Sequence, residues 1–186
     1  SYFESNITVT APMTIDGGVT WDETTWTNGI SRLAVLAPAA VDDNLASLWG
    51  GTYQQGFIVQ SSDVTIQDLT IDGEANPALT PGRNNFRVGI ATDNRIVQAF
   101  DNFVVDNVTV QHTYFYGISN RNDGVGMSIT DSRVEDVGYG AYPSYGILSF
   151  ADGTIARNEV DHGGYRAIGA ANASVTIEEN EIWAVD

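Results

Sequence analysis

The segment Asp63–Gly73, with the sequence DVTIQDLTIDG, contains the pattern that decides the fold. Apolar and polar residues alternate along it, as they do in a β-strand with one buried and one exposed side. Four later segments repeat the pattern: NFVVDNVTVQH (102–112), GMSITDSRVED (126–136), DGTIARNEVDH (152–162) and SVTIEENEIWA (174–184). Five copies of one short pattern predict an architecture built from structural repeats.

The same positions are apolar in all five copies. When the second residue of each segment is position one, position three holds Ile66, Val105, Ile129, Ile155 and Ile177. Position eight holds Ile71, Val110, Val134, Val160 and Ile182. Successive copies begin 39, 24, 26 and 22 residues apart. Because stacked repeats share one interior, we expect each set to form a continuous buried file.

A second motif alternates with the first. Its copies are VGIAT (88–92), YGISN (116–120), YGILS (145–149) and RAIGA (166–170). Gly, Asn and Asp separate the short strands, and no long segment has helical periodicity. These features predict an all-β solenoid, a parallel β-helix of about seven turns. Residues 1–186 are expected to form one such domain.

The V-x-I-x-x-L-T-I pattern of Val64–Ile71 and its echoes resembles the pectin-lyase-like superfamily, as found in bacterial and archaeal surface proteins. The segment SYFESNITVTAPMTIDGG (1–18) likewise resembles an early turn of bacterial β-helix proteins. The resemblance implies a right-handed parallel β-helix. Neither end of the sequence looks like the capping element that solenoids carry. We therefore expect a segment of a longer protein, or ends that are covered by other copies.

The charge balance excludes several partners. Asp and Glu number 24 against 8 basic residues, all of them Arg, which gives a net charge of −16. Such a surface repels nucleic acid and anionic membranes, and no apolar run is long enough for membrane insertion. It suits divalent cations such as Ca²⁺. Cysteine is absent, which removes disulfides and thiolate metal sites.

Three sequons, at Asn6, Asn107 and Asn172, permit an extracellular or cell-surface location. Two columns of equivalent residues have a structural interpretation. Asn158 and Asn180 are expected to form a hydrogen-bonded ladder at a corner. The aromatic residues Phe115, Tyr139 and Tyr165 are expected to pack a corner, or else to offer a platform for sugar rings.

One column contains chemically active side chains. His112, Asp136 and His162 occupy position ten of three consecutive repeats, and they are accompanied by Glu135, Asp161 and Arg166. Neighbouring repeats would place equivalent side chains about 4.8 Å apart. The imidazoles and carboxylates suggest a metal site, with Glu135, Asp136 and Asp161 as the acidic ligands. A His–Asp pair beside Arg166 suggests proton abstraction from a sugar acid. The third interpretation is chance coincidence at a solvent-facing strand end.

The motifs of known β-helix enzymes are poorly matched. Polygalacturonases carry an Asn-Thr-Asp triplet that is missing here, and Asp161–Gly164 (DHGG) matches their Gly-His-Gly motif only in part. We therefore expect a non-enzymatic extracellular scaffold, adhesin or fibre-forming module that needs no cofactor and self-associates through its terminal turns. The alternatives are a polysaccharide lyase or glycoside hydrolase using the histidine column, and a passive binder of extracellular polysaccharide.

Overall fold

The computed structural model describes residues 2–18, 34–40, 54–79, 86–93, 95–138 and 144–183. These residues form eighteen strands and no helix, so the described chain is all-β. Every strand pair is parallel. A search of the same residues for a helix long and apolar enough to cross a membrane finds none.

One sheet has six strands and contains the first half of each repeated segment. Its strands pair in chain order: β3 (Met13–Asp16), β6 (Val64–Gln67), β9 (Phe103–Asp106), β11 (Met127–Thr130), β14 (Gly153–Ala156) and β17 (Val175–Glu178). Burial alternates along β6, where Val64 and Ile66 are buried and Thr65 and Gln67 are partly exposed. β-Branched residues suit this half-buried pleat.

The other sheet has twelve strands in two rows, which the long strand β10 (Thr109–Asn120) joins. The first row also contains β1 (Tyr2–Phe3), β4 (Val35–Ala37), β7 (Thr70–Asp72), β12 (Arg133–Val137), β15 (Glu159–Asp161) and β18 (Glu181–Ile182). The second row contains β2 (Ile7–Val9), β5 (Gln55–Val59), β8 (Phe86–Thr92), β13 (Tyr145–Ser149) and β16 (Arg166–Ala170).

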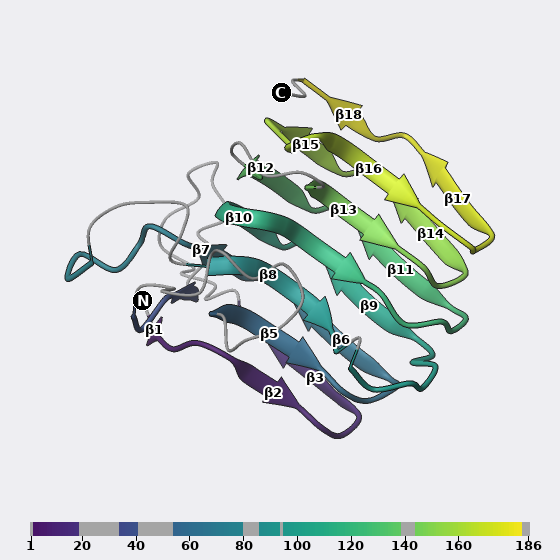
Figure 1. Ribbon diagram of the computed structural model, residues 1–186, viewed down its shortest axis with the longest axis horizontal. Helices are drawn as coiled ribbons and strands as arrows, with labels where there is room; N and C mark the ends of the chain where they lie inside the picture. The colour runs from purple at the N-terminus through teal and green to yellow at the C-terminus, as the bar shows by residue number, and fades with distance from the viewer. Residues whose placement is uncertain are drawn as a thin grey trace, which may run out of the picture.

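The strand register confirms the predicted repeat. Ile66 pairs with Val105, which pairs with Ile129, and the file continues through Ile155 to Ile177. The second predicted file, from Ile71 to Ile182, is also in register. Figure 1 shows the resulting stack, which runs from the purple N-terminal strands to the yellow C-terminal ones. Each repeat therefore lies on the one before it.

The buried files end at the last repeat. Ile66, Ile129 and Ile155 are fully buried, whereas Ile177 is 49% exposed and Ile182 is 51% exposed. The prediction that Ile177 is as buried as its file is therefore wrong. Strands β17 and β18 lie at the edges of their sheets, so no further strand of the described chain covers these side chains.

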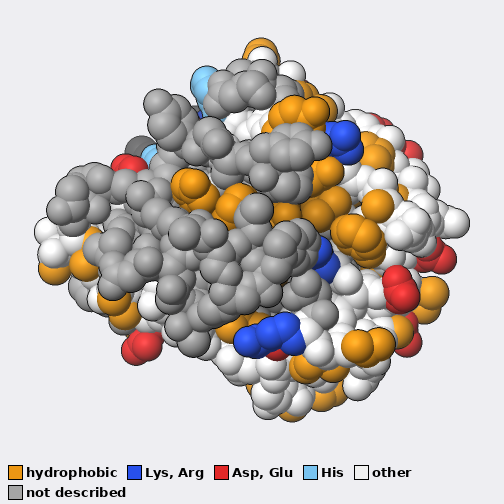
Figure 2. Space-filling view, viewed as in Figure 1, with side chains coloured by type: hydrophobic (Ala, Val, Ile, Leu, Met, Phe, Trp, Pro, Cys, Tyr) orange, Lys and Arg blue, Asp and Glu red, His pale blue; other side chains and the backbone are white. Residues whose placement is uncertain are grey.

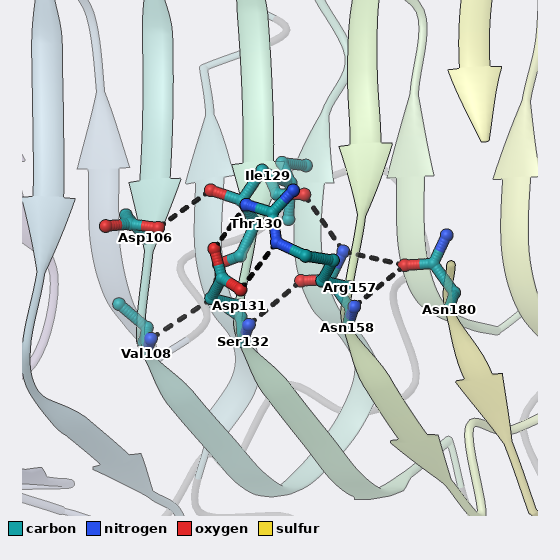
Figure 3. A network of polar contacts seen from close by, with 9 residues as sticks. All are labelled: Asp106, Val108, Ile129, Thr130, Asp131, Ser132, Arg157, Asn158 and Asn180. Carbon is teal, nitrogen blue, oxygen red and sulfur yellow. Dashed lines mark hydrogen bonds and ion pairs between the residues drawn. The ribbon is translucent and has the colours of Figure 1, made fainter. Parts of the chain in front are cut away.

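The predicted asparagine ladder is confirmed, and it includes a serine. Asn158 donates from Nδ2 to the Asn180 side-chain oxygen (2.9 Å) and to the backbone oxygen of Ile129 (2.9 Å). The backbone amide of Ser132 donates to Asn158 Oδ1 (3.0 Å), and Ser132 Oγ accepts from the Val108 amide (3.1 Å). Figure 3 shows this line of contacts crossing four repeats. It satisfies buried backbone groups at the corner where each chain segment leaves the first sheet.

A matched pair of substitutions tests the stacked core. Ile129→Ala is expected to lower the free energy of unfolding by about 3 kcal/mol, because it leaves a cavity in a fully buried file. Ile177→Ala, at an equivalent position of the half-exposed last repeat, is expected to cost less than about 1.5 kcal/mol. Urea denaturation measures both values. Equal losses would contradict the burial gradient along the file.

Candidate functional site

The candidate site crosses the strands of the first row at the level where β7 and β15 end. Asp72, Gln111, Glu135 and Asp161 occupy one row across β7, β10, β12 and β15. The next position holds Gly73, His112, Asp136 and His162, the column that the sequence predicts. His112, Asp136 and His162 all have positive φ angles near 50°, a conformation in which His and Asp are enriched among non-glycine residues. Strand β15 ends immediately before His162, whereas β10 and β12 continue past His112 and Asp136.

Glycine is required at the first position of the column. A Cβ atom on Gly73 would lie 2.0 Å from the backbone oxygen of His112. The close approach of these two backbone segments brings Asp72, immediately before Gly73, within reach of the imidazole. The glycine therefore contributes to the site without a side chain of its own.

His112 lies between carboxylates of the preceding and following repeats. Its Nδ1 atom is 2.8 Å from Asp72 Oδ1, and its Nε2 atom is 3.7 Å from Asp136 Oδ2. Asp72 also accepts hydrogen bonds from Gln111 Nε2 (2.7 Å) and from the Glu74 amide (2.8 Å). The His112 side chain is 24% exposed. A single imidazole thus connects three consecutive repeats.

These contacts favour the charged forms of both partners. The hydrogen bond with Asp72 raises the pKa of His112 above its usual value, although burial opposes the shift; nearby carboxylates reinforce it. Burial pushes the pKa of Asp72 upward, but the hydrogen bonds from His112, Glu74 and Gln111 outweigh burial and lower it. A protonated imidazole, which donates to Asp72 from Nδ1 and faces the Asp136 carboxylate with Nε2, suits this position, whereas a general base would have to be neutral.

The predicted three-residue column is only partly assembled. The structure brings His112 and Asp136 together, but it pairs His162 with its own neighbour, since His162 Nδ1 lies 2.8 Å from Asp161 Oδ1. The His162 side chain is half-exposed. The residue that the sequence reasoning missed is Asp72. Its signal was available, because Asp72 aligns with Gln111 beside the histidine and precedes the only glycine in the column.

Arg166 faces an aromatic row and not His112. Its Nη1 atom donates to the Tyr145 hydroxyl (3.2 Å), and its guanidinium lies 5.6 Å from the ring centroids of both Tyr145 and Tyr165. The Tyr145 ring in turn stacks on Tyr116, with 6.0 Å between ring centroids. Tyr116, Tyr145 and Arg166 are aligned in the strand register.

Of the predicted aromatic column, the structure describes only the two ends, Phe115 and Tyr165. Ser144 immediately precedes Tyr145 and therefore lies next to the aligned row of Tyr116, Tyr145 and Arg166. Tyr139 lies outside the described residues. Phe115 is buried, and the Arg87 guanidinium lies 4.8 Å from its ring centroid. Tyr165 remains 46% exposed. Phe115 therefore packs inside the protein, whereas Tyr165 is accessible to solvent.

The predicted metal ligands gain no support from the geometry. Glu135 accepts a hydrogen bond from Arg133 Nε (2.8 Å), and Asp161 is paired with His162. Within the described ranges, no three side chains of His, Asp or Glu lie close enough together to hold a metal ion. Glu135 thus pairs with an arginine of its own strand, and Asp161 contacts the imidazole that follows it.

The three sequons differ in their surroundings. Asn172 and Asn6 are exposed and have positive φ angles. Asn107 is partly buried, and its Nδ2 atom donates to Asp68 Oδ1 (2.6 Å). Glycosylation modifies that nitrogen, so the structure favours Asn6 and Asn172 as acceptors over Asn107.

The pH dependence of stability tests the His112 contacts. Because the folded protein raises the His112 pKa above its value in the unfolded chain, the stabilisation is complete below about pH 6.5 and is lost as the pH rises through the folded value. His112→Gln is expected to remove this slope and to cost about 1 kcal/mol at pH 6. Urea denaturation between pH 6 and about 9 provides the measurement. His162→Gln is the matched control and should keep the slope; a slope that survives in His112→Gln would rule out this assignment.

Comparison with known proteins gives no match. No protein-family model fits the chain, and neither a curated protein nor a solved structure is similar to it. What the chain can do must therefore be argued from its own contacts. These are a histidine held between carboxylates at one corner, and a tyrosine–arginine row at another.

Proposed function

We propose that the chain is a right-handed parallel β-helix of about seven turns, similar in fold to pectin-lyase-like proteins. We propose further that it is a non-enzymatic scaffold, adhesin or fibre module outside the cell. One observation carries the proposal: the ladder of parallel pairs runs unbroken from β3 to β17 in the six-stranded sheet. Such a ladder makes a stiff body whose repeats contact only their neighbours.

The unequal repeat lengths support a display function. Successive copies of the repeated segment begin between 22 and 39 residues apart, and yet the strand register is kept through all of them. The extra residues leave the ladder between strands, as residues 73–79 and 95–102 do. Length variation outside a constant frame is the property of a scaffold that presents loops.

The surface supports a location outside the cell. The exposed sequons at Asn6 and Asn172 can accept glycans, and the chain contains no cysteine that an oxidising medium would modify. The net charge of −16 keeps such a body soluble and away from anionic membranes.

An assay for turnover separates the scaffold from an enzyme. The protein is incubated with a panel of uronic-acid and neutral polymers, with and without calcium, while new unsaturated or reducing ends are measured. We expect no turnover above background, because the raised pKa of His112 opposes its use as a base. Turnover that disappears in His112→Gln and persists in His162→Gln would overturn the proposal in favour of a lyase or hydrolase.

A second candidate function is binding of an acidic polysaccharide without turnover. The Arg166 guanidinium lies 5.6 Å from the ring centroids of both Tyr145 and Tyr165, in a protein with only eight basic residues. Among the coloured side chains in Figure 2, apolar ones lie beside arginines, and acidic ones lie mostly toward the rim of the view. Tyrosine rings pack against sugar rings, and a guanidinium pairs with a carboxylate.

Calorimetry with a defined uronic-acid oligomer tests this second function. The double variant Tyr145→Ala/Arg166→Gln is expected to bind about tenfold more weakly, because it loses both the ring and the charge. Arg157→Gln is the control, since Arg157 pairs with Asp131 at a different corner. Equal affinity of all three proteins would exclude the aromatic row as the binding site.

A further inference from the structure

We propose that Tyr116 and Tyr145 form a site of oxidative modification, where a dityrosine bond joins two neighbouring repeats. The two residues are direct partners in the register of strands β10 and β13. Their rings are stacked, with 6.0 Å between centroids and 28° between ring planes. The inference goes beyond the scaffold function proposed above, because it depends only on the strand register and on the two phenol rings.

The Tyr145 ring is held between Tyr116 and the next repeat. On that far side, the Arg166 guanidinium lies 5.6 Å from the ring centroid, and its Nη1 atom donates to the Tyr145 hydroxyl (3.2 Å). A Cβ atom on Gly169 would lie 2.6 Å from Tyr145 Cε1, so the missing side chain leaves the space that the ring occupies. Because neighbouring strands are about 4.8 Å apart, the two tyrosine rings can meet by side-chain rotation without a change of register.

The ring contacts make this pair selective. Of the aromatic contacts between described residues, only this one joins two tyrosines; the other two pair Phe115 with Tyr114 and with Tyr116. Phenylalanine has no phenolic O–H whose proton could be lost on oxidation. Tyr145 is partly exposed and so gives an oxidant access to the pair, whereas Tyr116 is buried against it.

The reaction requires a one-electron oxidant, and a peroxidase with hydrogen peroxide supplies one. Each tyrosine loses one electron and its phenolic proton and becomes a tyrosyl radical. The two radicals join by a carbon–carbon bond between the positions next to their C–O carbons, and the hydrogen on each joined carbon moves to the phenolic oxygen. Two electrons and two protons thus leave the protein and reduce one hydrogen peroxide to two molecules of water.

The bond would stabilise the stack in the way that a disulfide stabilises other proteins. Tyr116 and Tyr145 are 29 residues apart, so joining them closes a loop and restricts the unfolded chain. The sequence contains no cysteine, so no thiol of the chain can form a competing bridge or intercept the oxidant. A protein in an oxidising medium could therefore gain a covalent link between repeats without a thiol.

Peptide mapping tests the position of the bond. The protein is treated at low concentration with peroxidase and hydrogen peroxide, and the monomer is isolated and digested with trypsin. Cleavage after Arg121 and Arg133 places Tyr116 and Tyr145 in separate peptides. We expect one linked peptide pair whose mass is lower than the sum of the two by two hydrogen atoms, together with dityrosine fluorescence. The linked monomer is expected to unfold at a temperature roughly 5–10 °C higher than the untreated protein.

Conservative variants identify the two rings. Tyr116→Phe and Tyr145→Phe each keep an aromatic ring and are expected to lose both the linked peptide and the fluorescence of the monomer. The matched controls are Tyr114→Phe and Tyr139→Phe, which alter the other tyrosine of each peptide and should keep both signals.

A linked peptide that persists in Tyr145→Phe would overturn the inference, and so would dityrosine that forms only between molecules or not at all. The scaffold proposal would stand in each of these cases, because the bond is not needed for it. Polymer turnover, in contrast, would overturn the scaffold proposal and leave the cross-linking result unchanged.

Discussion

The structure depends on the constant register with which each short strand stacks on its counterpart in the neighbouring repeat. Strands of three to five residues, such as β7 and β12, have too little apolar surface to be stable alone. Stacking buries Ile66, Val105 and Ile129 completely and pairs their backbones at the same time. Because a shift of one residue would turn every apolar side chain outward, the register is strongly specified.

The corners make this register compatible with a chain that must turn. Residues with positive φ recur at equivalent positions, among them Asn107, Asp131 and Arg157. At the next position, Asn158 and Asn180 satisfy backbone groups that the turn leaves unpaired. At the corners, side chains no longer alternate between the inner and outer faces as they do along a strand. The His112 contacts lie at one such position of positive φ, and Tyr145 and Arg166 are the first residues of β13 and β16.

The electrostatics of the His112 corner explain why a histidine column need not be catalytic. Carboxylates on both sides stabilise the imidazolium, and the charged ring then holds three repeats together. The tyrosine–arginine row differs from the His112 corner in its accessibility, because Arg166 and the neighbouring Tyr165 are exposed to solvent. A scaffold can use the first arrangement for cohesion and the second for contact with another molecule. The acidic charge elsewhere on the surface makes the few accessible arginines distinctive.

The sequence by itself determined the repeat, its two buried files and the asparagine ladder, because alternating apolar positions and unequal spacings can be counted along the chain. It also placed His112 beside Asp136. Where the connecting loops differ in length, only the tertiary structure decided which side chains of neighbouring repeats contact each other. Eight positions separate Val137 from Tyr145, against three from Thr113 to Tyr116 in the preceding repeat, so counting from the repeated segment does not locate Tyr145, the residue that aligns with Tyr116. Likewise Asp72 was found beside His112 because two backbones approach closely at Gly73. The periodicity of the sequence determines which residues lie in one buried file. The contacts at the corners depend instead on the length and path of each loop before the chain re-enters the sheet.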